Sequence, residues 1–322
     1  VKQAFLLAFG KEYANARKRW LERYDPNALI DGVQATVHYD EFIHKDLIHF
    51  SKYDCERSVP SLVDGLKPSQ RKVLHAVFQR NLTKAMKVAQ LAAYVAEKTA
   101  YHHGEQSLNG AIVGLAQDFV GSNNFPPLMP EGQMGSRLQG GKDSASPRYI
   151  FTRMNPLLPA LFPEADRPLL NYLDDDGTPI EPEYFVPILP LVLVNGAEGI
   201  GTGFSCRVPT FHPRVLAENL KRLMEGEECL DMEPWTRGFR GRLVETVSTG
   251  VNRGMKRWTS HGVVQQISLN QLEITELPVG VWTDNYKEQL EDWILNKKDF
   301  GLIDYESHYT ESEVRFVLRF SR

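Results

Sequence analysis

Apolar residues recur at helical spacing through roughly the first third of the chain. This periodicity predicts five helices. The first, at 11–24, is charged and exposed, and the second, at 41–54, has a broad apolar face. The third opens at Lys67-Pro68, and two more follow at 88–99 and 105–119.

The third helix has a clear start, because proline suits the first turn of a helix. Its expected buried stripe is Val73, Leu74, Val77 and Phe78, and the basic residues Lys67, Arg71 and Lys72 lie near its start. The last two helices flank a short break at His102-His103-Gly104. Such a pair suggests helix-turn-helix geometry, which presents a helix to a DNA groove. Most helix pairs bind nothing, so this pattern alone does not establish DNA binding.

The periodicity disappears between 121 and 148, where Gly, Pro, Ser and Asn are abundant, and we expect a loop there. A loop of this length is uncommon inside a compact domain and is usually functional or disordered. It carries Arg137, Lys142 and Arg148, and its glycines would let the backbone approach a ligand closely. It ends at Tyr149.

After residue 180 the composition shifts to apolar stretches typical of strands, interleaved with two helical patterns. Strands are expected within 186–196, 241–247, 262–269 and 271–279, and helices at 212–226 and 284–296. This order predicts a mixed α/β second domain.

The composition is ordinary for a globular protein, with 42% hydrophobic and 24% charged residues, which excludes disorder, collagen and a coiled-coil rod for the whole chain. The longest apolar run, at 187–196, is about half of the roughly twenty residues that a membrane-spanning helix needs. The 3 cysteines have no C-x-x-C spacing, so neither a zinc site nor a disulfide framework is supported. A reducing intracellular compartment is the natural interpretation. Because the chain begins with Val-Lys-Gln, we expect it to be an excised fragment.

The net charge of -4 conceals a basic middle segment. Residues 57–153 hold twelve Lys and Arg against six Asp and Glu, and the remainder of the chain is acidic. Such a segment is the footprint expected where a protein meets phosphates. Ordinary solvated charge is the alternative.

Three attractive motifs fail as ligand sites. The glycines from Gly196 to Gly203 follow an expected strand, but no Gly-Lys-Ser/Thr follows, and two prolines prevent the helix that a nucleotide site needs. Asp174 to Asp176 are consecutive and fit a solvated turn better than a metal site. His102 and His103 are adjacent and cannot chelate one metal together. We interpret them as donors to phosphate or backbone.

Tyr149 stands out among the 12 tyrosines because of its neighbours. It follows Pro147-Arg148 at the end of the Gly/Ser loop and precedes an apolar pair. A phenol is a poor nucleophile unless the charge on its oxygen and on the attacked group is compensated. The adjacent guanidinium offers a rigid fork of donors for phosphate oxygens. A core tyrosine with a satisfied hydroxyl remains the alternative.

Five segments together resemble eukaryotic-type DNA topoisomerase II: ERSVPSLVDGLKPSQRKVL, AYHHGEQSL, FVGSNN, GGKDSASPRYIFT and LVNGAEGIGTGFS. The resemblance covers essentially the whole chain and matches the DNA gate of that family. It implies an α+β fold, in which a winged-helix (helix-turn-helix) domain is followed by a mixed α/β tower domain. The expected divisions are a helical connector from a missing Toprim domain at 1–45, the winged-helix cleavage domain at 46–178, and the tower at 179–322, truncated before the coiled coil.

The resemblance also implies roles for single residues. Tyr149 matches the tyrosine that attacks a DNA phosphodiester and leaves a 5'-phosphotyrosyl link, and Arg148 matches the arginine that stabilises the transition state. Ile200 resembles the apolar wedge that enters between base pairs and bends the duplex, in agreement with the physics of intercalating side chains. Trp282 resembles a tower position that touches the flanking duplex, although Gly280-Val281 depart from the basic residues expected there. The matching segments also contain further expected DNA contacts: Arg57, Lys67, Arg71, Lys72, Tyr101, His102, His103 and Ser107. Arg137 and Lys142 of the long loop are expected contacts as well.

The implied activity is ATP-dependent: a transient double-strand break through which a second duplex passes. The implied cofactors are Mg²⁺ and ATP, both bound by Toprim and ATPase domains absent here, with no metal site in this chain. The implied partners are double-stranded DNA and a second copy of the chain, in a homodimer through the DNA gate, with no membrane. We expect a nuclear location, with mitochondrial and viral origins open, and a fragment that is inactive alone. A non-catalytic winged-helix DNA-binding module is the main alternative, and a nucleotide-dependent α/β enzyme is a third.

Overall fold

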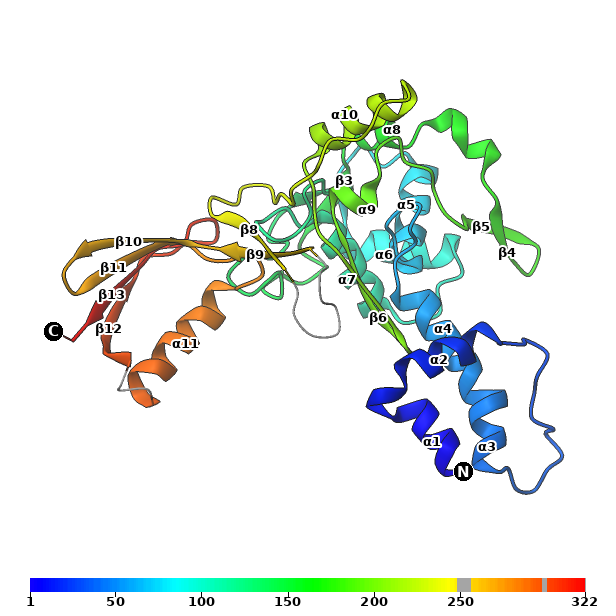
Figure 1. Ribbon diagram of the computed structural model, residues 1–322. Helices are drawn as coiled ribbons and strands as arrows, with labels where there is room; N and C mark the ends of the chain where they lie inside the picture. Colours follow the sequence, from blue (N-terminus) through cyan, green and yellow to red (C-terminus); the bar gives the residue numbers. More distant parts are fainter. Residues whose placement is uncertain (248–255, 297–299, 322) are drawn as a thin grey trace.

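The computed structural model describes residues 1–247, 256–296 and 300–321, and it is mixed α+β. Three separate hydrophobic clusters divide these residues into an N-terminal helical unit, a large central body and a C-terminal β-rich body. Figure 1 shows the N-terminal unit in blue at one end and the C-terminal body in orange and red at the other, with the central body between them.

The N-terminal unit consists of α1 (Lys2–Phe9), a 3-10 turn, α2 (Ala14–Glu22), α3 (Tyr39–Phe42), a π-helical turn (Ile43–Leu47) and α4 (Ile48–Ser58). Its core joins Trp20 and Leu21 of α2 to Ile43 and Ile48. The helix predicted at 11–24 therefore exists as α2, but it is not fully exposed. The helix predicted at 41–54 is confirmed, although the π-helical turn interrupts it, and α1 was not expected.

The central body is built on three helices and a small antiparallel sheet. Its helices are α5 (Pro68–Arg80), α6 (Val88–Lys98) and α7 (Glu105–Ala116), whose predicted positions are confirmed. The sheet has the order β1-β3-β2, with β1 (Met86–Lys87) and β2 (Leu128–Glu131) on either side of β3 (Phe151–Met154). The core of this body includes the four apolar residues predicted for α5. The strand β2 lies inside the stretch that was predicted to be loop only, and this part of the prediction is wrong.

The chain after β3 stays with the central body longer than the sequence indicated. It forms α8 (Leu158–Leu161), a 3-10 helix (Glu164–Leu169), the hairpin β4 (Tyr172–Asp175) and β5 (Thr178–Pro182), α9 (Leu191–Val194), the hairpin β6 (Ala197–Gly201) and β7 (Phe204–Val208), and α10 (Pro213–Met224). Phe185, Leu191 and Leu216 share one core with α5 to α7, although the predicted boundary at 178/179 assigned them to the second domain. The strand predicted within 186–196 is wrong, because the chain there turns into the short helix α9 after Pro190.

The C-terminal body pairs a four-stranded antiparallel sheet with one helix. The sheet has the order β10-β11-β13-β12, and α11 (Thr283–Asn296) packs Leu290 into the core that Ile274 and Phe316 form on the sheet. The strands are β10 (Val263–Ser268), β11 (Gln271–Glu276), β12 (Leu302–Ser307) and β13 (Phe316–Phe320), and a separate hairpin of β8 (Arg242–Val247) and β9 (Lys256–His261) precedes them. The predicted strands at 241–247, 262–269 and 271–279 and the helix at 284–296 are confirmed.

Two smaller expectations are also met. Asp174 to Asp176 lie at the exposed turn of the β4/β5 hairpin, where Asp176 and Gly177 have positive φ angles of 49° and 82°. The Asp174 carboxylate accepts a hydrogen bond from the backbone N–H of Gly177 at 2.8 Å, as in an ordinary turn. Within the described residues, none of the helices is long and apolar enough to cross a membrane.

Buried ion pairs connect distant segments. The guanidinium of Arg71 forks onto the fully buried Asp64 carboxylate, with Nε–Oδ2 at 2.7 Å and Nη2–Oδ1 at 3.0 Å. That carboxylate also accepts the backbone N–H groups of Leu66 and Phe185, so it fixes the start of α5 against the segment after β5. Arg137 and Glu276, both buried, pair at 2.6 Å and join the central body to β11.

Asp64→Ala should lower the free energy of unfolding by about 3–5 kcal/mol, because it leaves a buried guanidinium and two backbone donors without their acceptor. Urea unfolding followed by circular dichroism measures this change. The control is Lys98→Ala, which removes an exposed pair with Glu97 and should cost about 0.5 kcal/mol or less. Equal losses in the two variants would contradict the role given to Asp64.

Candidate active site and nucleic-acid interface

Tyr149 projects from a turn whose backbone is fixed at both ends. The carbonyl oxygens of Pro147 and Ile150 accept the N–H groups of Ala89 and Val88 at 3.1 and 3.0 Å. These two donors are among the N–H groups that the first turn of α6 cannot satisfy within the helix. Ile150 is 2% exposed and anchors the turn in the core, whereas Tyr149 is 76% exposed. The phenol therefore stands in solvent on a rigid base.

Arg148, which precedes Tyr149 in the sequence, carries a cation that is unpaired among the residues that the structure describes. Both residues are exposed, and in the part of the chain that the structure describes the Arg148 guanidinium has no ion pair or hydrogen bond. Such a group is available to an anionic ligand. Because a guanidinium presents several donors in a rigid plane, it can bind two oxygens of one phosphate. The pair Arg148–Tyr149 thus combines a nucleophile with a donor for the group that it would attack.

The long loop before Tyr149 is ordered by side chains that satisfy its backbone. The Gln117 amide donates to the carbonyl oxygens of Met134 and Gly141 at 2.9 and 3.2 Å. The Asp143 carboxylate accepts the backbone N–H of Ser136 at 2.9 Å. Gly141 has a φ of +84°, and a Cβ there would lie 2.2 Å from the Gln117 amide nitrogen. Glycine suits position 141 because of this positive φ, and a Cβ there would also displace the Gln117 amide.

A second group of predicted residues gathers where α4 ends and α7 begins. Tyr101 donates from its hydroxyl to the Ser107 hydroxyl at 3.1 Å, and the rings of Tyr101 and His103 meet edge to face at 5.5 Å. Tyr53 of α4 hydrogen-bonds the Nε2 of His103. Partial burial lowers the pKa of His103 below its ordinary value, and the charges of Arg57, His102 and Lys72 act in the same direction. His103 is therefore neutral at pH 7 and bonds the Tyr53 hydroxyl, while exposed Arg57 and His102 remain free for a ligand.

Ile200 lies near the tip of the β6/β7 hairpin and is 75% exposed. Figure 1 shows this hairpin running from the central body toward α4 and α2. Ser205 is its cross-strand partner and is exposed as well. An isolated branched apolar side chain on an extended hairpin is the geometry that an intercalating wedge needs.

The family is decided by the comparison with known proteins. A family model that describes DNA gyrase and topoisomerase IV matches residues 57–322, and one described as the C-terminal associated domain of TOPRIM matches residues 1–55. The chain belongs to the type II DNA topoisomerases.

Individual relatives agree with this assignment. The chain is 48% identical to DNA topoisomerase 2 of Arabidopsis thaliana and 47% identical to DNA topoisomerase 2-alpha of Rattus norvegicus, in both cases over 98% of its own length and 21% of theirs. It therefore spans about a fifth of these relatives. A crystal structure described as the Plasmodium falciparum topoisomerase II DNA-binding, cleavage and re-ligation domain superposes with a TM-score of 0.87 and 41% identity, over 99% of this chain and 43% of that one.

Three of the basic residues predicted to contact DNA form ion pairs with carboxylates of this topoisomerase chain itself. Arg71 and Arg137 are only 6% and 3% exposed and are held in the ion pairs described above. Lys72 is half-buried, and its Nζ binds the Glu181 carboxylate at 2.8 Å and the Thr99 carbonyl at 2.6 Å. Arg71 and Arg137 are therefore almost entirely buried against their internal partners, and the charge of Lys72 is balanced by Glu181. The carboxylates that pair with Lys72 and Arg137 come from distant segments, so the local sequence gave no sign of them, whereas Asp64 lies only seven residues before Arg71.

Trp282 also has a packing role. Its ring meets Phe119 edge to face at 5.9 Å and covers Gly140, where a Cβ would lie 2.3 Å from the indole. The backbone N–H of the next residue but one, Asp284, donates to the carbonyl of Leu138 at 3.0 Å. Half-buried Trp282 thus holds the start of α11 against the loop that precedes Tyr149.

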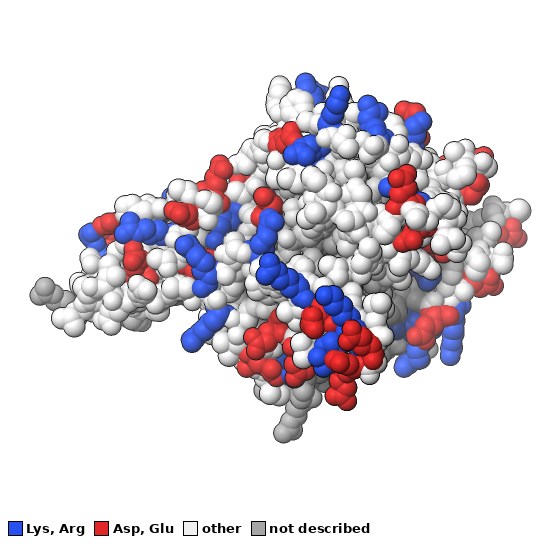
Figure 2. All heavy atoms as spheres, turned by 90° about the horizontal axis from the view of Figure 1, so that it is seen from above, with Lys and Arg blue, Asp and Glu red and all other residues white. Residues whose placement is uncertain are grey.

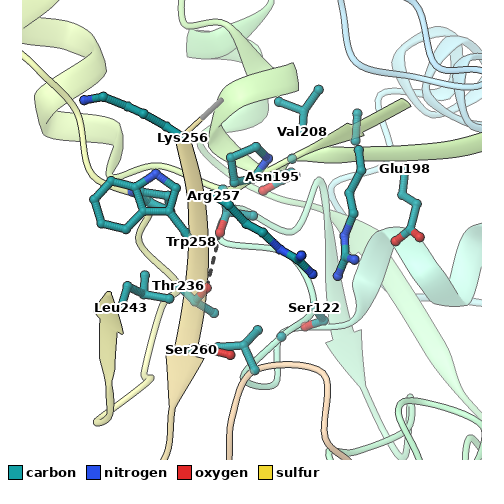
Figure 3. A pocket seen from close by; sticks show the side chains of 18 residues that line it. Ser122, Asn195, Glu198, Val208, Thr236, Leu243, Lys256, Arg257, Trp258 and Ser260 are labelled. Atoms are coloured by element: carbon teal, nitrogen blue, oxygen red, sulfur yellow. Dashed lines mark hydrogen bonds between the residues drawn. The ribbon is translucent and has the colours of Figure 1, made fainter. Parts of the chain in front are cut away.

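One basic cavity was not expected from the sequence. A cavity of about 560 Å³ lies between the base of the β6/β7 hairpin, the 121–122 turn and the β8/β9 hairpin, and its lining includes Arg207, Lys256 and Arg257. Figure 3 shows Arg257 reaching across this cavity, with Trp258 beside it on the same strand and Glu198 on the far side. The basic-aromatic run Lys256-Arg257-Trp258 is visible in the sequence and could have indicated it.

Charge on one face gives little further guidance. Figure 2 shows Lys and Arg interspersed with Asp and Glu when the molecule is seen from above, with a broad uncharged area over the central body. This face therefore carries no single large patch of positive charge that would mark a nucleic-acid interface.

Tyr149→Phe should leave the free energy of unfolding within about 0.5 kcal/mol of the parent, because the Tyr149 hydroxyl makes no hydrogen bond with the described residues. Thr152→Val is the contrasting variant. Its buried hydroxyl donates to the Met129 carbonyl at 2.8 Å, and its loss should cost about 1–3 kcal/mol. Chemical denaturation checks both values, and a large loss in Tyr149→Phe would mean that the phenol is structural.

Proposed function

We propose that this chain cuts and rejoins DNA within an ATP-dependent type II topoisomerase, which opens a transient double-strand break and passes a second duplex through it. The observation that carries the proposal is the exposed Tyr149 on its fixed turn, next in sequence to Arg148, which has no ion pair or hydrogen bond with the described residues. Membership in the topoisomerase family supports the same activity.

The proposed step exchanges one phosphodiester for another. The Tyr149 phenol oxygen attacks the phosphorus, its proton departs, and the bond from phosphorus to the 3'-oxygen breaks. The 3'-oxygen takes up a proton, and the 5'-phosphate stays esterified to the tyrosine. Bond energy is approximately conserved, so the reverse attack by the 3'-hydroxyl reseals the strand without an external energy source. ATP would serve strand passage instead.

Arg148 is proposed to stabilise the charge that accumulates on the phosphate oxygens. Donors that are already positioned where charge develops lower the barrier without reorganisation. The fixed backbone on both sides of Arg148 and Tyr149 supports this role, because it holds the Cα positions of the two residues in place. Neither residue would have to leave another partner to bind the substrate.

The DNA path is proposed to follow the residues that remain available on the surface. In this interpretation the body around α5, α6 and α7, with the β1-β3-β2 sheet as its wing, is the winged-helix domain of residues 46–178. Residues 179–322 are proposed to be the tower, although residues up to Leu216 also pack into the core of the central body, and residues 1–45 are proposed to be the connector after a Toprim domain. Ile200 would insert between base pairs. The remaining candidate contacts are Arg57, Lys67, Tyr101, His102, His103, Ser107, Lys142, Arg207 and Arg257.

Mg²⁺ and ATP are proposed to act through other domains of the full-length enzyme. The residues that the structure describes contain no group of three or more His, Cys, Asp and Glu that could hold a metal ion, so they do not fit a resident metal site. No step of the proposed chemistry is therefore assigned to a metal bound by this chain.

The proposed assembly is a homodimer on double-stranded DNA, in which each protomer cuts one strand. Two tyrosines are needed for a double-strand break, and Tyr149 of each protomer would supply one. The proposed location is the nucleus. One relative, 47% identical over 97% of the chain, is named as the mitochondrial DNA topoisomerase 2 of Dictyostelium discoideum.

Tyr149→Phe in the full-length enzyme should abolish covalent attachment to end-labelled duplex in the presence of Mg²⁺, because no oxygen remains to attack phosphorus. Arg148→Ala should reduce the cleavage rate about 100- to 1,000-fold. Denaturing gels detect the protein–DNA adduct, and peptide sequencing locates the label. A labelled peptide from outside 144–151, or relaxation that survives Tyr149→Phe, would support a non-catalytic DNA-binding module instead.

DNA binding should weaken steeply with salt, because each phosphate contact releases counterions. Arg57→Ala should lower the slope of log K against log salt concentration by about 0.9, the value expected for one lost contact. Lys45→Ala is the matched control, since Lys45 pairs with Glu41 on the N-terminal unit and should leave the slope unchanged. Fluorescence anisotropy over a salt series measures the slope for the parent and for both variants. A parent affinity that does not change with salt concentration would contradict a basic interface.

A further inference from the structure

The β6/β7 hairpin has two faces with different surroundings. Successive side chains of a strand point to opposite faces. Gly199 and Gly201 face α4: a Cβ at 199 would lie 2.2 Å from the Ser58 carbonyl oxygen, and one at 201 would lie 3.0 Å from the Cys55 Cα. Ile200 therefore points away from α4, which agrees with its exposure. The two glycines let the hairpin backbone lie directly on the helix.

The turn of the hairpin is hydrogen-bonded to the same helix. The Thr202 hydroxyl donates to the Asp54 carboxylate at 3.1 Å, and the Cys55 thiol donates to the Thr202 carbonyl at 3.2 Å. The other Asp54 oxygen accepts the Ser58 hydroxyl at 3.3 Å, which orients the carboxylate. Partial burial and the Asp54 carboxylate raise the pKa of the Cys55 thiol above its ordinary value, so the thiol keeps the proton that it donates.

Helix α2 supports the hairpin from a second side. The Lys18 ammonium lies 5.5 Å from the centre of the Phe204 ring, and a Cβ at Gly203 would lie 3.1 Å from the Arg17 Cβ. The tip that carries Ile200 is thus held by α2 and α4, both of which belong to the N-terminal unit. The base of the same hairpin belongs to the central body.

We propose that Asp54, Cys55 and Thr202 are positioning residues that set how far Ile200 enters the duplex. The inference rests on the proposed function, in which Ile200 is the wedge. A bent duplex pushes back on the inserted side chain, and a two-stranded hairpin is marginally stable by itself. The contacts with α4 resist that push, so their loss lets the hairpin yield and shifts the equilibrium toward unbent DNA.

The same contacts couple bending to the N-terminal unit. Residues 1–55, which include Asp54 and Cys55, match the model of the C-terminal associated domain of TOPRIM. A displacement of α4 would move the hairpin turn with it, and bending of the duplex would in turn favour one position of α4. Such coupling between two sites is necessarily reciprocal.

The test compares DNA bending with DNA binding in the full-length enzyme. Energy transfer between the labelled ends of a duplex reports the ratio of bent to unbent DNA, and anisotropy reports affinity. Thr202→Val and Asp54→Ala should each lower the bent-to-unbent ratio about 2- to 10-fold, the range expected for one lost hydrogen bond. Thr202→Ser keeps the hydroxyl donor and Asp54→Asn keeps an oxygen acceptor, so each should bend DNA to the same ratio as the parent. The double variant Asp54→Ala/Thr202→Val should behave like either single variant.

Two reference variants separate the possible failures. Thr178 is an exposed residue at the turn of the β4/β5 hairpin, and its side chain makes no hydrogen bond with the described residues. Thr178→Val should therefore leave bending unchanged. Ile200→Ala should abolish most bending. If Ile200→Ala bends DNA normally, the wedge role in the proposed function is wrong. If Ile200→Ala fails to bend while Thr202→Val and Asp54→Ala match Thr178→Val, the positioning proposal alone is overturned.

Discussion

The need to satisfy the first N–H groups of α6 is the constraint on which the candidate active site depends. A helix cannot bond these donors internally, and a buried donor without a partner is costly. Here the carbonyls of Pro147 and Ile150 supply the acceptors, and this fixes the residues between them. Tyr149 is consequently exposed without being mobile in its backbone. The same interaction that completes a helix therefore presents the phenol to solvent.

Glycine contributes to this molecule mainly through close packing. Gly141 lets the loop approach Gln117, Gly140 lies under the Trp282 indole, and Gly199 and Gly201 bring the β6/β7 hairpin onto α4. A loop rich in glycine usually suggests flexibility or an approach to a ligand. In this chain the space that a Cβ would fill is already occupied by another part of the protein. Gly140, Gly199 and Gly201 thereby bring the other two bodies against the central body.

Charged residues divide into two classes that look alike in the sequence. Arg71 and Arg137 are buried and hold segments together, whereas Arg57 and Arg148 are exposed and free of ion pairs in the described structure. Whether a cation is paired can depend on a carboxylate from a distant segment. Glu276 of β11 pairs with Arg137, and Glu181 at the end of β5 pairs with Lys72. The basic balance of the middle segment is thus larger than the charge that it can offer to a phosphate.

The sequence by itself predicted the helices of the central body and most of the long loop, and it singled out Arg148-Tyr149 as the candidate reactive pair. These depend on local periodicity, on proline at a helix start and on neighbouring residues, all of which can be read along the sequence. It did not determine the short helix at Leu191–Val194, the extent of the central core, or which cations remain free. Only the tertiary structure decided these, because burial and ion pairing depend on residues that folding brings together from far apart in the chain.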